Sequence, residues 1–222
     1  MRKRKDGEAT RRRMLTAACE VFGRKGYRDA THAELCRRAK TNIASINYHF
    51  GSKDGLYRAA WAHAADAMDR RYPHDGCVPA TASTEERLRG NIRAILLRNL
   101  DERMACFHSI RMMELVNPTG LLDEDFARRL RKLRAYTLGI LRELLGPSSA
   151  KRDLELCEMS LISQCRMVSL HPRGRLGKEL PQFDIKDIDD LVGHIARFTL
   201  AGICAMRNGI SARKRKRKGR TA

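Results

Sequence analysis

Apolar residues recur at the spacing of an α-helix along nearly the whole chain of 222 residues, and this period is the strongest constraint on its fold. One helix is expected from Lys53 towards Arg71, and beyond residue 80 the helical ranges are about 84–101, 103–116, 121–145, 150–170 and 184–207. Segments rich in Gly or Pro separate them at 72–83, 117–120, 146–149 and 171–181. No segment shows the strict alternation of apolar residues that is typical of a strand. The chain is therefore expected to be all-α, with about nine helices.

The first 60 residues contain shorter helices with clear start and stop signals. A first helix is expected from about Glu8 to Lys25, because Gly26 is a typical C-terminal residue. Thr31 precedes Glu34 by three residues, which is the spacing of a capping box at the start of a second helix.

A third helix is expected from Ile43 to Phe50, with Asn42 as its N-cap. Ile43, Ile46 and Phe50 lie at i, i+3 and i+7, so they should be buried together. The residues expected to face outward are Ala44, Ser45, Asn47 and Tyr48. Two short helices at a tight corner, the second with a polar face, are typical of a helix-turn-helix that enters a DNA major groove. The same shape also occurs in αα-hairpins that do not bind DNA.

The charge of the chain favours an anionic partner. The net charge is +19. Residues 1–13 contain seven Lys or Arg and two acidic residues, and residues 213–222 contain seven and none, so the ends supply +12 of the total. A basic tail at 211–222 is expected to be disordered, and it would strengthen non-specific phosphate binding.

Several function classes lack their sequence signals. Seven cysteines without paired spacing indicate a reduced, cytoplasmic compartment, and no apolar run approaches about 18 residues, so we expect no membrane partner. A signal peptide is also not expected. Cys106-Phe-His108 and His74-Asp-Gly-Cys77 are poor metal motifs, so no metal or cofactor is expected. No nucleophile elbow or phosphate loop indicates an enzyme.

The N-terminal motifs resemble those of one family. Phe22-Gly-Arg-Lys-Gly-Tyr27, Ala33-Glu-Leu-Cys-Arg-Arg-Ala39 and Ser45-Ile-Asn-Tyr-His-Phe-Gly-Ser-Lys-Asp-Gly-Leu-Tyr57 resemble the DNA-binding head of TetR-family transcriptional regulators. Many members have Gly-Val where this chain has Lys40-Thr41, and Tyr where it has Asn47. Residues 111–119 and 194–203 are similar to the CecR-like branch. The resemblance implies an Ω-shaped homodimer that binds a palindromic operator, usually as a repressor, and a small-molecule inducer bound in the C-terminal half.

Carried over to this sequence, the resemblance implies specific DNA contacts. The implied base readers are Thr41, Asn42, Ser45 and Asn47, with Ala44 against a thymine methyl. The implied phosphate contacts are Thr31, Tyr48, His49 and Lys53. Three alternatives stay open: Asn42 as a cap alone, His49 packed against the first helix, and Lys53 as a solvated charge.

The C-terminal half carries two hypotheses, each with a core-packing alternative. Helices over 154–168 and 185–206 are apolar on several sides and favour either an intramolecular core or a four-helix dimer interface. The candidate interface residues are Met159, Ile162, Ile195, Phe198 and Gly202. A ligand pocket rich in methionine would include Met104, Phe107, His108, Arg111, Met112 and Cys165. Arg111 and Glu114 would either supply polar contacts there or form a surface pair.

These observations predict three segments. Residues 1–60 form a three-helix DNA-binding head with a basic arm at 1–8, residues 61–210 form a helical regulatory and dimerisation domain, and residues 211–222 form the tail. The rival interpretation is an architectural DNA binder that tolerates any sequence and has no inducer.

Overall fold

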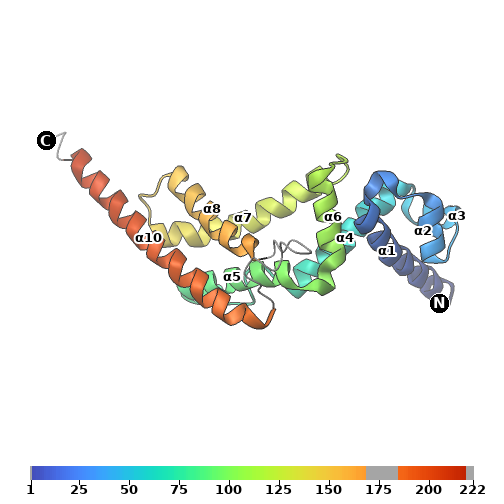
Figure 1. Cartoon of the computed structure of the whole chain (residues 1–222), viewed down its shortest axis with the longest axis horizontal. Coiled ribbons are helices and arrows are strands. Elements are labelled where there is room, and N and C mark those ends of the chain that lie inside the picture. Colours follow the sequence, from blue (N-terminus) through green and yellow to red (C-terminus); the bar gives the residue numbers. More distant parts are fainter. Residues whose placement is uncertain (1, 169–184, 219–222) are drawn as a thin grey trace, which may run out of the picture. The chain divides into compact units, whose positions relative to one another are not determined.

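The expected all-α architecture is confirmed (Figure 1). A computed structural model describes residues 2–168 and 185–218, and in this part of the chain every regular element is helical. The loop expected at 171–181 lies outside the described residues. The α-helices are α1 (Arg2–Asp29), α2 (His32–Ala39), α3 (Ile43–Phe50), α4 (Lys53–Arg71), α5 (Thr84–Leu100), α6 (Ala105–Val116), α7 (Asp123–Leu145), α8 (Lys151–Met167) and α10 (Ile188–Lys218).

The ends of two helices differ from the sequence expectation. Gly26 interrupts α1 with a φ of 77°, as its position predicts, and the chain then resumes a helical turn up to Asp29. At the other end α10 continues to Lys218, where a disordered tail was expected from residue 211. Residues 210–218 contain no Gly or Pro, and Ala, Lys and Arg are good helix formers, which accounts for the longer helix.

The chain divides into two compact units. One comprises Met1–Arg71 and Glu102–Arg128, and the other comprises Tyr72–Asp101 and Arg129–Ala222. The first unit thus groups α6 with the head, because α1 and α4 both pack against α6. Packing therefore divides the chain differently from the sequence boundary at residue 60, which followed chain order alone.

The core of the first unit is built where α1, α4 and α6 meet. Phe22 of α1 is fully buried, and its ring meets that of Tyr57 of α4 edge-on at 4.8 Å. Trp61 stacks on Phe107 of α6 at 5.2 Å and on Phe126 at 5.1 Å. Aromatic pairs of this kind contribute about 0.5–1.5 kcal/mol beyond their buried area. These aromatic contacts hold together α1, α4 and α6, and α2 and α3 lie between α1 and α4 in the chain.

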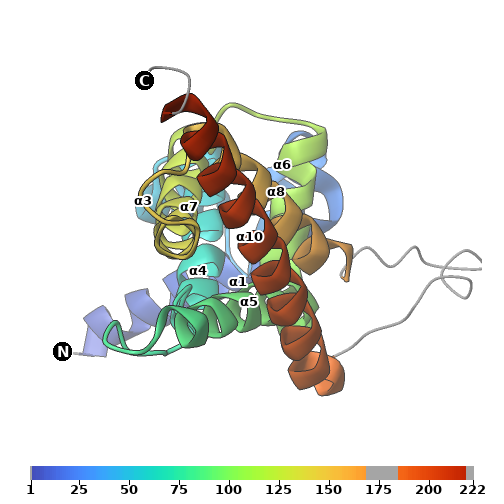
Figure 2. The same cartoon turned by 90° about the vertical axis from the view of Figure 1, so that its left-hand side faces the viewer.

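The core of the second unit lies between α5, α8 and α10. The long α10 crosses α5 and packs beside α8 (Figure 2). Leu88 and Ile92 of α5, Leu161 of α8 and Ile195 of α10 are all nearly inaccessible to solvent. Each such side chain stabilises the fold by about 1.5–3 kcal/mol when buried.

Candidate nucleic-acid interface

The start of α2 is fixed by Thr31. Its side chain accepts a hydrogen bond from the backbone N–H of Glu34 at 3.2 Å, so Thr31 caps the helix as expected. The second half of the expected capping box differs. The Glu34 carboxylate pairs with Lys25 at 2.6 Å and with Arg24, and these cations lower its pKa. Glu34 therefore ties α2 to the end of α1.

The turn between α2 and α3 depends on a strained lysine. Lys40 has left-handed backbone angles (φ 50°, ψ 55°), and its N–H donates to the carbonyl of Arg37. The N–H of Thr41 donates to the carbonyl of Cys36 at 3.0 Å, which closes the turn. A left-handed conformation costs a residue with a side chain about 1–2 kcal/mol. The turn places Lys40 and Thr41 just before α3, the second helix of the helix-turn-helix, which we call the recognition helix.

Asn42 is the N-cap of α3. Its Oδ1 accepts hydrogen bonds from the N–H of Ser45 at 2.9 Å and from the Ser45 hydroxyl at 3.0 Å. Asn42 therefore caps α3, as expected. The Ser45 hydroxyl also takes part in the cap, so the hydrogen-bonding groups of Asn42 and Ser45 are partly used within the protein.

The outward face of α3 combines predicted residues with one that was missed. Ala44, Asn47 and Tyr48 are exposed, and Tyr48 reaches 85%. Ile46 is buried as expected, but Ile43 is 50% exposed, so the prediction that Ile43 is buried was wrong. Three residues of helix turn through about 300°, which leaves Ile43 about 60° away from Ile46 on the side of Asn47. No signal within α3 identified it, because Phe50, which was also expected to be buried, lies only about 20° from Ile43 around the helix.

A cationic site marks the start of α4. Ser52 caps this helix by accepting the N–H of Gly55 at 3.1 Å. Lys53 follows, with its Nζ 4.5 Å from the centre of the Tyr27 ring, and partial burial lowers its pKa. Tyr27 donates its hydroxyl to Asp54, which raises the pKa of that phenol. The first N–H groups of a helix attract anions, so this corner suits a phosphate.

The remaining predicted DNA contacts lie on the same head. Thr31 is exposed and His49 is half-buried. The His49 ring lies 5.0 Å from that of Tyr48 and 6.2 Å from that of Phe50. Arg11 of α1 lies over the Phe50 ring at 5.2 Å. The nine predicted DNA contacts thus lie just before α2, in the turn before α3, on α3 and at the start of α4.

The predicted pocket residues are divided between the two units. Phe107, His108 and Arg111 are neighbours on α6: the Phe107 ring lies 5.6 Å from that of His108 and 5.7 Å from the Arg111 guanidinium carbon. Met104 is half-buried and Met112 is 49% exposed. Cys165 lies in the core of the second unit, so it does not share a packed core with the others. Burial raises the pKa of the Cys165 thiol to about 12.

The predicted interface residues have different degrees of burial. Met159 and Phe198 are 58% and 63% exposed, and Gly202 is also exposed. Ile162 is half-buried. Ile195 is only 3% exposed and belongs to the core of the second unit, so for this residue the alternative of an intramolecular core is observed.

The described helices and side chains offer neither a membrane span nor a metal site. None of the helices over 2–168 and 185–218 is both long and apolar enough to cross a membrane. Within the same ranges, no three His, Cys, Asp or Glu side chains are grouped so that they could hold a metal ion.

Comparison with known proteins identifies the two halves. Residues 14–60 match the family described as bacterial regulatory proteins, tetR family, and residues 84–203 match the C-terminal domain of the HTH-type transcriptional dual regulator CecR. The CecR protein of Shigella flexneri is 32% identical over 145 residues, 65% of this chain and 55% of its own length. The regulator BetI 1 of Chromohalobacter salexigens is 34% identical over 95 residues, 41% of this chain and 43% of its own. The chain thus spans about half the length of these relatives.

Solved structures share the fold. A TetR-like transcriptional regulator from Rhodococcus sp. RHA1 aligns over 87% of this chain and 96% of its own, with a TM-score of 0.58 and 20% identity. A second regulator from the same source aligns over 86% and 96%, with a TM-score of 0.62 and 17% identity. The helix-turn-helix head and the two family matches place the chain in a family of DNA-binding transcriptional regulators. The chain belongs to the TetR family and carries the C-terminal domain of its CecR branch.

Proposed function

We propose that this protein is a cytoplasmic, ligand-responsive repressor that binds a palindromic operator as a homodimer and is released by a small molecule. Residues 1–60 serve as the DNA-binding domain and residues 61–210 as the regulatory and dimerisation domain. The observation that carries the proposal is α3, a capped helix whose Asn47 and Tyr48 are exposed while Ile46 anchors it in the head.

The proposed contacts divide into readers and positioning groups. Asn47 reads a base edge in the major groove, since an asparagine amide can pair bidentately with adenine. Ala44 and the exposed Ile43 offer apolar contacts to thymine methyl groups. Tyr48 and Lys53 bind phosphates and fix the register of the head without reading sequence. Thr41, Asn42 and Ser45 complete the reading edge, and Thr31 and His49 complete the phosphate contacts.

A second copy of the chain would supply the other half-site. Exposed Met159 on α8 and Phe198 on α10, beside the open surface at Gly202, support pairing through these two helices. Two heads about 34–36 Å apart fit successive major grooves on one side of a duplex. A palindrome with that spacing is therefore the expected operator.

Contacts inside the first unit support a route from the regulatory half to the head. Glu114 of α6 is buried and accepts hydrogen bonds from the Tyr57 hydroxyl at 2.7 Å and from Thr119. Trp61 donates to Asp125 at 2.7 Å, and Arg58 donates to the carbonyl of Leu121 at 2.6 Å. These bonds connect α4 to α6 and to the segment that follows it.

In this mechanism, a ligand that repositions α6 repositions α4 and changes the distance between the two recognition helices. The ligand must bind one of the two spacings better than the other, because otherwise it shifts no population. Phe107, His108 and Arg111 on α6 are the proposed ligand contacts, with Met104 and Met112 as further candidates from the same unit.

The test is selection from a random duplex library by the purified full-length protein at near-physiological salt. Recovery of a palindrome would support specific dimeric binding. Recovery of no motif, with steep salt dependence, would favour the sequence-tolerant architectural binder instead. A reporter gene behind the recovered site then decides the sign of regulation: repression supports the proposal, and activation overturns that part of it.

A further inference from the structure

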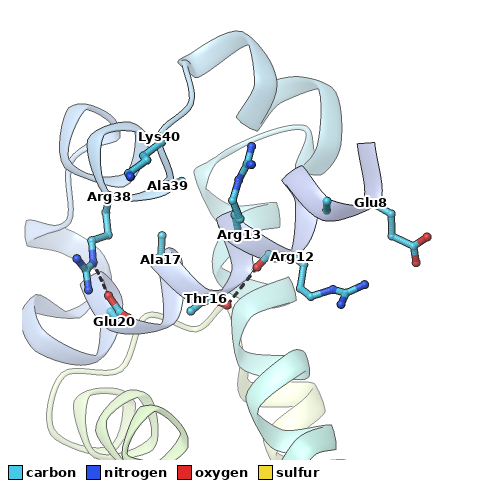
Figure 3. Close-up of a pocket in the computed structure, with 10 residues that line it drawn as sticks. Glu8, Arg12, Arg13, Thr16, Ala17, Glu20, Arg38, Ala39 and Lys40 are labelled. Atoms are coloured by element: carbon cyan, nitrogen blue, oxygen red, sulfur yellow. Dashed lines mark hydrogen bonds and ion pairs between the residues drawn. The ribbon is translucent and has the colours of Figure 1, made fainter. Parts of the chain in front are cut away.

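A basic groove runs between α1 and α2 on the head (Figure 3). Its volume is about 640 Å³. Ala17 of α1 and Ala39 of α2 lie between its walls, and Arg13 and Lys40 project on either side of them (Figure 3). A second hollow of about 410 Å³ adjoins the groove, since Glu20, Arg38 and Lys40 line both.

Most of the cations in these two hollows are not neutralised. Arg38 pairs with Glu20, and Arg24 of the second hollow pairs with Glu34. The remaining cations form no ion pair with another described side chain, and they are Arg12, Arg13, Arg37 and Lys40. Arg13 makes one hydrogen bond, to the Thr10 hydroxyl at 3.2 Å. The groove is lined by four cations and two acidic residues, Glu8 and the paired Glu20, and this excess of positive charge suits a polyanion rather than an apolar ligand.

The position of Lys40 links this groove to α3. Lys40 is a wall of the groove and immediately precedes Thr41 and Asn42, where the recognition helix begins. It also holds a left-handed backbone conformation that glycine or asparagine would adopt at lower cost. Strained residues of this kind concentrate where a side chain has a function, and the feature that distinguishes lysine from glycine here is its charge.

We propose that the groove between α1 and α2 binds the phosphate backbone of the duplex beyond the base pairs that α3 reads. The major groove is about 12 Å wide, so a phosphate strand borders the helix that enters it, and Lys40 lies at the first residue before that entry. Arg12 and Arg13 on α1 line the same groove as Lys40 and add two cations to it (Figure 3). The inference rests on the proposed function and extends it, because none of these three residues belongs to the recognition helix or to the start of α4.

The test compares full-length wild type with the double variant Arg13→Gln/Lys40→Asn. Asparagine tolerates the left-handed backbone, so this variant removes charge without adding strain. The matched control is Arg131→Gln/Lys132→Asn, which makes the same charge change on exposed positions of α7. A second variant, Arg12→Gln/Arg13→Gln, leaves the turn untouched. Binding is measured by fluorescence anisotropy on two probes: the palindrome recovered by selection, trimmed to its motif, and the same duplex lengthened by about ten base pairs at each end.

On the lengthened probe, each phosphate that a variant no longer neutralises should reduce the slope of log affinity against log salt by about 0.9. If the variant leaves two phosphates per head without a cation, wild type should lose about 12-fold more affinity per head than the variant between about 50 and 200 mM salt. The control should behave as wild type, and all proteins should bind the trimmed probe alike.

Wild-type slopes for both groove variants on the lengthened probe would overturn the inference, as would an equal loss on both probes. A groove that instead binds an acidic protein would leave both DNA slopes unchanged, which also overturns it. Failure of the proposed function looks different, because wild type itself would then show no preference for the selected palindrome over random DNA.

Discussion

The polar side chains of α3 and its cap differ in how many of their hydrogen-bonding groups are already used within the protein. Asn42 uses its carbonyl oxygen on Ser45, so part of its hydrogen-bonding capacity serves the helix cap. Asn47 lies exposed on the same helix, one turn further on. Sequence discrimination by this head should therefore depend more on Asn47 than on Asn42.

Replacing Asn47 with alanine should alter site preference rather than general affinity. Removal of a bidentate base contact costs about 1–3 kcal/mol on the operator, while binding to random DNA should stay as in wild type. Anisotropy titrations of both duplexes at one salt concentration measure this difference. An equal loss on operator and random DNA would show that Asn47 does not read a base.

Lys53→Ala provides the contrasting variant. Because a phosphate contact carries no sequence information, affinity for operator and random DNA should fall by the same factor, and the salt slope should decrease by about 0.9. Unchanged binding to both would show that Lys53 serves only the Tyr27 ring below it.

Short-range chemistry explains what could be predicted at these positions. The caps Thr31 and Asn42 follow from residues three apart, and both are observed. The pairing of Glu34 with Lys25 joins two helices, so nothing within the α2 segment indicated it. Exposure of Ile43 depends on which side of a two-turn helix its neighbours cover, and an i, i+3, i+7 count does not resolve that.

At the scale of elements, the corner between α3 and α4 requires a glycine. A Cβ added at Gly55 would lie 1.9 Å from the carbonyl oxygen of Phe50, and that oxygen belongs to the backbone and cannot rotate away. The tight approach fixes the recognition helix relative to Lys53 and the start of α4. The apolar period of the sequence predicted the length of α4. The need for glycine at its third residue, Gly55, follows only from the close contact with Phe50.

Gly55→Ala should therefore destabilise the protein although alanine is the better helix former. Overpacking typically costs about 1–3 kcal/mol, and here the backbone must move. Chemical denaturation measures the loss. Gly139→Ala on α7 is the matched control, since a Cβ there meets no atom within 4 Å and should stabilise by up to about 1 kcal/mol. Similar stability for both variants would contradict the steric argument.

The start of α5 should make stability depend on pH. Ser83 and Glu86 form a complete capping box, with hydrogen bonds of 3.2 Å and 2.9 Å to the two backbone N–H groups. Hydrogen bonds from Ser83 lower the pKa of Glu86 below its ordinary value of 4.5. A lowered folded-state pKa contributes stability above the unfolded value, and this contribution is lost as the pH falls through the folded value.

Glu86→Gln should remove this dependence, because glutamine keeps the reciprocal cap without a titrating group. Thermal melts of wild type and variant from about pH 6 to about pH 3 should therefore diverge least at the acidic end. A gap that widens on acidification would contradict the assignment.

At the scale of the molecule, the sequence period predicted the number and order of helices, and the family motifs predicted the class of protein. Two properties were not available from either source. The grouping of α6 with the head depends on long-range packing, such as the stacking of Phe107 on Trp61. The separation of Cys165 from the other pocket candidates depends on it as well, since both segments have the pattern of apolar helices.

Some apolar residues on α8 and α10 are exposed and others are buried in the core, so substitutions at the two kinds of position can distinguish assembly from folding. Phe198 is 63% exposed and Met159 is 58% exposed, whereas Ile195 on the same α10 is buried in the core. Phe198→Glu should therefore leave the far-UV circular dichroism and the melting temperature close to wild type, because a charge at an exposed position costs little folding free energy. In a homodimer the same charge would be desolvated, which opposes association.

Sedimentation equilibrium should show the Phe198→Glu variant as a monomer where wild type is a dimer, with operator affinity reduced toward that of one half-site. Ile195→Glu is the contrast, since it places a charge in the protomer core and should unfold the second unit. A Phe198→Glu variant that stays dimeric and binds the palindrome normally would exclude this face of α10 as the interface. The second recognition helix would then have to be held in register by a different surface.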